Sequence, residues 1–134
     1  MKKYEFTGET KVVDGITLNR IRAIRVFGNI KAGDIGGWIE KEENLSHEGS
    51  AWVCGSAKVF GSAKVCANSD YIVFKNWWSS GRYFTWTKSN NMWMVGCFYG
   101  TGEELIKKAY KDSEISGREY ERIVKYVESI QQQQ

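Results

Sequence analysis

The chain has 134 residues, 26% of them charged, and a net charge of +3, which is the composition of one folded domain and excludes a disordered chain. That charge is too small to indicate nucleic-acid binding by itself. No apolar run reaches the roughly 18 residues of a membrane helix, and the first residues lack an apolar signal core. The three cysteines form no Cys-x-x-Cys pair, which argues against a disulfide framework or a zinc site. We therefore expect a cytoplasmic protein without membrane contact, metal or cofactor.

The first 27 residues have the pattern of a β-hairpin. Two strand-like runs, 4–13 and 16–27, are separated by the pair Asp14-Gly15. This pair suits a tight turn because both of its residues can adopt positive φ. Side chains alternate along a strand, so Arg20 and Arg22 should project from the same face of the second strand.

The clearest pattern in the sequence is a six-residue repeat. Gly-Ser-Ala-x-Val-x occurs three times, at 49–54, 55–60 and 61–66, and fades by residue 70. Hexapeptide repeats are typical of parallel β-helices, in which about three hexads complete one triangular coil. We expect a short parallel β-helix of the left-handed type over residues 28–70. The glycine-rich stretch 28–39 would supply a preceding coil, and the hairpin would cap one end.

The second half of the chain changes character. Three aromatic-rich runs, 71–77, 82–87 and 92–97, are separated by turn residues and predict an antiparallel meander. Two capping boxes, beginning at Thr101 and at Ser116, precede apolar residues at helical spacing.

Together these patterns predict an α+β, mainly β fold. The expected single domain, 1–134, consists of a hairpin (1–27), a short β-helix (28–70), a meander (71–98) and two helices (101–130).

Several segments resemble a family of small phage and prophage accessory proteins that carry a variable number of Gly-Asn/Ser-Ala-x-Val hexads. The resemblance rests on residues 3–10, on Gly-Asp-Ile-Gly-Gly-Trp-Ile-Glu at 33–40, on the hexads, and on residues 95–101. It covers nearly the whole chain but carries over no catalytic or ligand residue. By analogy with other small phage proteins, it implies a non-catalytic protein in an infected bacterial host that inhibits a defence system by binding a host protein. A structural or assembly component of the phage is a further alternative.

A second hypothesis follows from aromatic side chains that alternate with cations. Aromatic rings that stack on a base, beside an arginine for phosphate, are a common way to hold nucleotides. The chain could therefore sequester a small nucleotide signal. The residues expected to bind it are Trp77, Trp78, Arg82 and Trp86 in the meander and Arg20 and Arg22 in the hairpin. The same rings could instead pack the meander onto the helices.

The single histidine, His47, raises the alternative of an acyltransferase, since hexapeptide-repeat enzymes use a histidine as general base. Those enzymes stack many more coils than this chain can form, so we expect His47 to be a turn residue and the chain not to be an enzyme. Finally, Trp52 and Phe60 should point outward from the coil as an apolar strip. That strip predicts a homodimer or another closed homo-oligomer.

Overall fold

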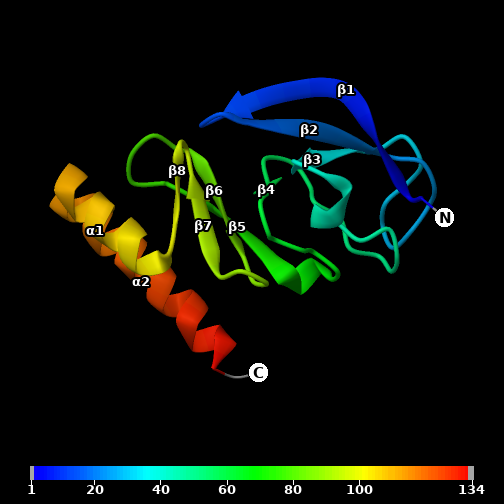
Figure 1. The fold of residues 1–134 in the computed structure, drawn as a ribbon. Coiled ribbons are helices and arrows are strands. Elements are labelled where there is room, and N and C mark those ends of the chain that lie inside the picture. Colours follow the sequence, from blue (N-terminus) through cyan, green and yellow to red (C-terminus); the bar gives the residue numbers. More distant parts are fainter. Residues whose placement is uncertain (1, 133–134) are drawn as a thin grey trace.

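Two four-stranded sheets and two C-terminal helices make up the chain, in a computed structural model that describes residues 2–132 (Figure 1). The first sheet has the order β1 (Tyr4–Val13), β2 (Ile16–Ala23), β3 (Ile35–Ile39) and β4 (Lys58–Val59). The second has the order β5 (Tyr71–Lys75), β6 (Tyr83–Thr87), β7 (Met92–Val95) and β8 (Phe98–Gly100). The helices are α1 (Gly102–Asp112) and α2 (Glu114–Gln131), and short 3-10 turns occupy Glu42–Asn44 and Asn68–Asp70.

The N-terminal hairpin has the expected turn but a different role in the fold. Asp14 and Gly15 both have positive φ, 51° and 80°, and β1 pairs antiparallel with β2. The second strand ends at Ala23, four residues before the expected Phe27. Its other edge pairs antiparallel with β3, so β2 lies inside a sheet instead of capping a coil.

The predicted parallel β-helix is not present, and this part of the fold-class prediction is wrong. Within residues 28–70 the only strands are β3 and the two-residue β4, which share two parallel Cα pairs. One isolated parallel bridge, Leu45 to Val65, lies outside them. The first sheet is therefore mainly antiparallel. Three hexads complete only about one coil, and the segment before them pairs with it in parallel only at β4 and at the bridge between Leu45 and Val65.

Some backbone amides of the hexads donate to side chains elsewhere in the chain, whereas those of Ala57, Ala63 and Val65 donate to backbone carbonyls. The amide of Lys58 donates to Thr85 Oγ1 (3.3 Å) and that of Lys64 to Ser89 Oγ (2.8 Å). Buried backbone donors need such partners wherever a sheet ladder is missing.

The six-residue period does mark the buried face of this segment. Val53, Val59 and Val65 are fully buried, as are the alanines two residues before each of them. β3 passes very close to the hexads: the amides of Gly37 and Trp38 donate to the carbonyls of Val53 (2.7 Å) and Ala57 (3.0 Å).

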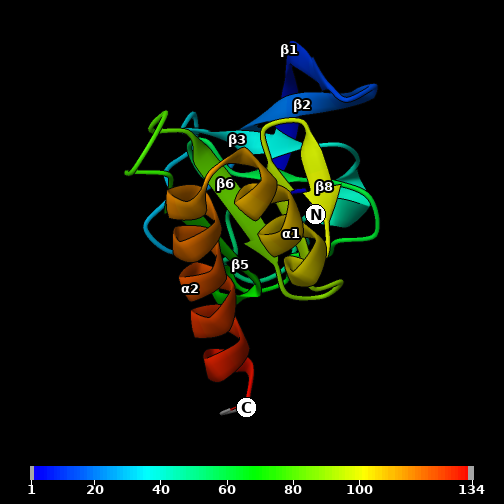
Figure 2. The same ribbon diagram turned by 90° about the vertical axis from the view of Figure 1, so that its left-hand side faces the viewer.

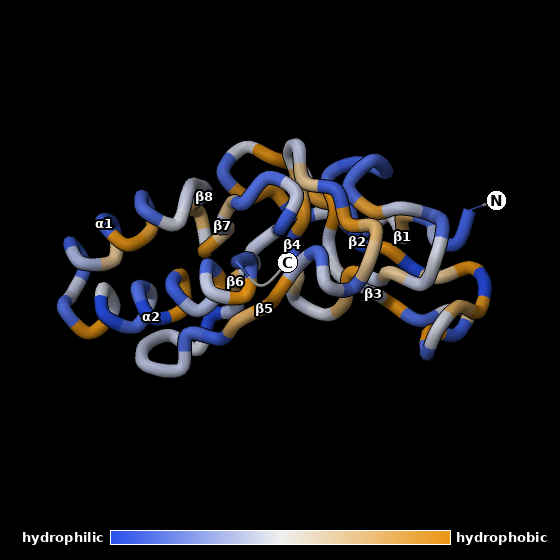
Figure 3. The backbone as a smooth tube through the Cα atoms, turned by 90° about the horizontal axis from the view of Figure 1, so that it is seen from below, coloured by the Kyte–Doolittle hydropathy of each residue, from blue (hydrophilic) through white to orange (hydrophobic). Residues whose placement is uncertain are grey.

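The second sheet has one strand more than the sequence predicted, because β8 has only three residues and follows a tight turn at Gly96, whose φ is 57°. Both helices pack on this sheet (Figure 2), and the tube coloured by hydropathy shows hydrophobic and hydrophilic stretches alternating along them (Figure 3). The first capping box forms, since Thr101 Oγ1 accepts from the amide of Glu104 at 3.2 Å. The second helix begins at Glu114 with Ser113 as its cap, before the expected Ser116.

A small cluster joins the two sheets. Leu18 and Trp38 from the first sheet pack with Phe60 of the hexads and Met94 of β7. This contact holds one face of the first sheet against the second sheet.

A buried lysine ties the start of the chain to the hexads. Lys3 is fully buried, and its Nζ lies 2.6 Å from the carbonyl oxygen of Ala51 and 3.4–3.5 Å from those of Glu48 and Gly49. Burial lowers the pKa of this ammonium, with a smaller effect from Arg25. The carbonyl groups compensate for part of that cost, because they would otherwise lie without a donor.

We predict that Lys3→Met destabilises the fold. Methionine fills a similar volume but leaves the carbonyl groups unpaired, which costs about 1–3 kcal/mol of unfolding free energy. Urea unfolding followed by circular dichroism measures the change. Lys2→Met is the matched control, because Lys2 only pairs with Glu42 at the surface. Equal stability of the two variants would contradict a structural role for the buried ammonium.

We also predict that stability falls steeply above pH 10. Tyr4 is fully buried, and burial, then Glu42, raises the pKa of its hydroxyl above the usual 10.0. The folded state therefore keeps a proton that the unfolded state releases, so stability is complete below pH 10 and is lost as the pH rises further. Urea unfolding between pH 8 and 11 should show, in Tyr4→Phe, a slope smaller by up to about 1.4 kcal/mol per pH unit. Identical slopes in the two proteins would show that Tyr4 does not contribute to the loss of stability above pH 10.

Candidate functional site: a basic pocket between the sheets

The register of the first sheet places two cations on either side of one tryptophan. Arg20 pairs with Trp38 across β2 and β3, and Trp38 pairs with Lys58 across β3 and β4. Paired residues project from the same face of a sheet, so the three side chains form a row. The row faces the second sheet, where Lys58 meets β6.

The row forms one wall of an open pocket of about 400 Å³. Lys11 of β1 lies over the Trp38 ring, and Arg82 and Tyr83, where the chain enters β6, also line the pocket. The full lining is Lys11, Arg20, Trp38, Gly55, Ser56, Lys58, Arg82 and Tyr83. It contains four cations and no carboxylate.

Trp38 is the middle residue of the row, and two of the cations lie over its ring. Its side chain is only 4% exposed. Lys11 Nζ lies 4.2 Å and the Arg20 guanidinium 5.0 Å from the ring centroid. The negative face of the ring attracts both cations, so they are partly oriented before any ligand arrives. Arg20 Nε also donates to the carbonyl of Gly36 at 3.1 Å.

Lys58 is a half-buried cation of the pocket with two other cations nearby. Burial, and then the nearby charges of Lys11 and Arg82, lower its pKa. Among residues 2–132 its Nζ has no hydrogen-bond acceptor, and none of the four cations forms an ion pair with a carboxylate. Like charges gathered without a counter-ion cost folding energy, so an anion bound here would relieve a strain that is already present.

The structure brings together two of the six side chains that the sequence suggested for binding, Arg20 and Arg82, from opposite halves of the chain. Arg22 lies elsewhere and is paired with Glu5.

The three tryptophans suggested for binding lie away from this pocket. Trp86 is 1% exposed, and its Nε1 donates to Asn91 Oδ1 at 2.8 Å. Trp78 donates to Ser116 Oγ at 3.1 Å and packs edge-on against Tyr120 of α2. Trp86 thus contacts the loop before β7, and Trp78 contacts α2. Trp77 is 70% exposed and leans on Trp78.

Sequence reasoning missed Lys11, Trp38 and Lys58, and it did not single out Tyr83 among the aromatic residues of the meander. The alternation of Ala57, Lys58 and Val59 did place Lys58 opposite the buried face, but the repeat gave no reason to single it out. Its proximity to Arg20 depends on the parallel pairing of β3 with β4, which no local pattern reports.

The outward orientation expected for Trp52 and Phe60 is wrong. The two side chains are 5% and 4% exposed. Trp52 packs edge-on against Phe27, and Phe60 lies under Tyr99 with a centroid distance of 4.4 Å. The chain thus covers both rings by itself. A homo-oligomer stays a prediction, but the apolar strip from which it was argued is not exposed.

His47 has both ring nitrogens engaged. Its Nδ1 accepts from the amide of Lys3 at 3.1 Å, and its Nε2 lies 2.9 Å from Glu42 Oε1. The ring also stacks on Tyr4 with a centroid distance of 4.0 Å. A histidine held in this way has no free nitrogen to take a proton from a substrate.

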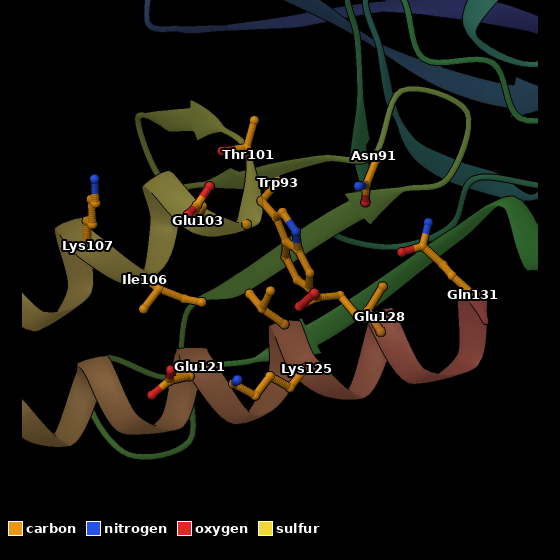
Figure 4. Close-up of a pocket in the computed structure, with 13 residues that line it drawn as sticks. Asn91, Trp93, Thr101, Glu103, Ile106, Lys107, Glu121, Lys125, Glu128 and Gln131 are labelled. Carbon is orange, nitrogen blue, oxygen red and sulfur yellow. The ribbon is translucent and has the colours of Figure 1, made fainter.

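A second, larger cavity of about 540 Å³ lies between α1, α2 and β7 (Figure 4). Trp93 points into it from the sheet, with Ile106 and Val124 beside it, and its rim carries three glutamates and two lysines. Because this rim mixes both signs of charge, it selects no ligand class. The basic pocket is the stronger candidate.

Comparison with known proteins gives one partial similarity. The chain is 36% identical over 61 residues, 40% of its length, to a protein of Escherichia coli (strain K12) named uncharacterized acetyltransferase YdcK. The match spans only 19% of the length of that relative. No protein-family model matches the chain. The similarity is compatible with a hexapeptide-repeat protein.

No helix within residues 2–132 combines the length and the apolar character needed to cross a membrane.

We predict that Lys58→Met stabilises the folded chain. The folded state disfavours the charged form of Lys58, since its pKa is lowered, so removing the charge favours folding. The expected gain is a rise of about 2–4 °C in the unfolding midpoint. Thermal unfolding at low salt measures it. Lys64→Met, at the same position of the next hexad but exposed, should leave the midpoint unchanged. A midpoint lowered by Lys58→Met would mean that the ammonium has a structural partner.

Proposed function

We propose that the chain is a non-catalytic binding protein that sequesters a small phosphate-bearing ligand, of the nucleotide class, in the basic pocket. The observation that carries this proposal is the set of four cations, Lys11, Arg20, Lys58 and Arg82, around one open volume of about 400 Å³ without a lining carboxylate.

The chemistry of the pocket favours phosphate over other anions. Two guanidinium groups can each donate two parallel hydrogen bonds to phosphate oxygens, and two ammonium groups add point charge. A carboxylate ligand would bring a single negative charge to four cations. A ligand with one or more phosphates matches the site better.

An exposed ring at the rim supports a nucleotide. Tyr83 is 47% exposed and lines the pocket beside Arg82. An exposed ring next to a phosphate-binding arginine can stack on a base, which contributes roughly 1–3 kcal/mol per base.

Acyl transfer is less well supported. The similarity to YdcK covers too little of that protein to carry over its named activity. The engaged nitrogens of His47 also remove the one histidine that could act as general base.

Sequestering a nucleotide signal is one way in which a phage-encoded inhibitor of host defence could act. This proposed role would agree both with the resemblance to phage accessory proteins and with the basic pocket. Inhibition by direct binding of a host protein stays a separate prediction, as does a role in phage assembly.

Calorimetric titration and thermal shift with pyrophosphate and with linear and cyclic nucleotides test the proposal. A ligand at 100 times its dissociation constant should stabilise the fold by about 2.7 kcal/mol. Lys58→Ala and Arg20→Ala should each weaken binding by roughly tenfold or more, which corresponds to about 1.4 kcal/mol. Affinity should fall as salt concentration rises.

Lys64→Ala is the matched control and should bind like the unchanged chain. The proposal is wrong if none of these anions binds, or if Lys58→Ala and Lys64→Ala bind equally well.

A further inference from the structure

The Gly-Ser turn that begins each hexad occurs at Gly55 and again at Gly61, with different neighbouring side chains. Each hexad begins with a corner at Gly-Ser, where the glycine has positive φ, 58° at Gly55 and 64° at Gly61. The two corners have the same hydrogen bond, from Ala57 to the carbonyl of Cys54 (3.1 Å) and from Ala63 to that of Phe60 (3.3 Å). They can therefore be compared position by position.

A carboxylate occupies the corner at Gly61. The amide of Gly61 donates to Glu40 Oε1 at 2.9 Å. One more hexad along, the repeat has ended: Ala67 is extended, with φ of −142°, and Asp70 caps the 3-10 turn that follows it. The corner at Gly61 thus shows that the backbone of a Gly-Ser corner can bind a carboxylate of this chain.

The corner at Gly55 has no such acceptor. Within residues 2–132 neither the amide of Gly55 nor that of Ser56 has a hydrogen-bond partner. A Cβ atom built on Gly55 would meet no atom within 4 Å, so that side of the corner is uncrowded. Both residues line the basic pocket, with Lys58 three positions further on. Free amides in a turn form a concave donor site for anions.

We infer that the corner at Gly55 and Ser56 receives a terminal phosphate group, so that the ligand of the pocket is a phosphomonoester. This inference rests on the proposed function. The donors at hand are two amides, the Ser56 hydroxyl and the neighbouring cations. They match a group with three free oxygens and a charge of about −1.5 to −2. A phosphodiester has two free oxygens and one charge, so it would leave part of the donor set unpaired.

A built-in carboxylate tests the corner. Ser56→Asp adds a carboxylate at the corner that corresponds to the one bound by Glu40, next to four cations that lack a counter-ion. It should raise the unfolding midpoint by about 2–4 °C. It should also weaken phosphomonoester binding by roughly a hundredfold, which is two tenfold steps of about 1.4 kcal/mol each.

The same substitution at the next corner is the control. Ser62→Asp adds a second carboxylate beside Glu40 and removes the hydroxyl within 3.3 Å of Asn90 Nδ2, so it should lower the midpoint and leave ligand affinity unchanged. If Ser56→Asp lowers the midpoint as well, or leaves affinity intact, the corner is not an anion site.

Ligand choice separates this inference from the proposed function. Calorimetry compares 5′-AMP with 3′,5′-cyclic AMP, with pyrophosphate as reference. The inference expects 5′-AMP to bind at least about tenfold more tightly than cyclic AMP, and to weaken below pH 6 as its phosphate gains a proton. If pyrophosphate and both nucleotides fail to bind, the proposed function falls. If pyrophosphate binds but the two nucleotides bind equally, only the phosphomonoester inference falls.

Discussion

The close approach of β3 to the hexad segment is the constraint on which the rest of the fold depends. A Cβ atom on Gly36 would lie 2.6 Å from the Trp52 ring, and one on Gly37 would lie 2.7 Å from the carbonyl oxygen of Ala57. Glycine at both positions therefore allows the backbones to meet, and it fixes the pairing of Trp38 with Lys58. Since β3 also pairs with β2, the same approach brings Arg20 into the row. The contact between β3 and the hexads therefore forms both the core of the first half and the row of residues that lines the basic pocket.

The sequence predicted burial better than it predicted topology. The valine period of six and the Asp14-Gly15 turn are local features, and both appear in the structure. Closure into a β-helix is not local, because it needs a second coil whose backbone pairs with the first. Three hexads do not provide one, and the strand next to them comes from β3, whose direction is set by its pairing with β2.

The residues of the candidate site also fall into those that the sequence indicated and those that only the topology brings together. An arginine in a strand and an arginine before an aromatic strand are visible in a sequence, and Arg20 and Arg82 line the same pocket. The tryptophans were misleading because a large ring signals recognition and core packing equally well. Trp86 and Trp93 are both 1% exposed in the core of the second half. Trp38, the ring that does serve the pocket, lies in a glycine-rich stretch whose partners only the sheet register determines.

The distribution of charge supports a ligand more strongly than the amount of charge does. The net charge of the chain is +3, whereas the basic pocket alone gathers four cations, so the rest of the molecule is slightly acidic. Ion pairs elsewhere in the described residues join Glu5 to Arg22 and Glu42 to Lys2, whereas none is formed by the four cations of the pocket. Glu40 binds the corner at Gly61, whereas no side chain within residues 2–132 binds the amides of the corner at Gly55. Four cations beside these free backbone donors are the arrangement from which we propose that an anion binds here.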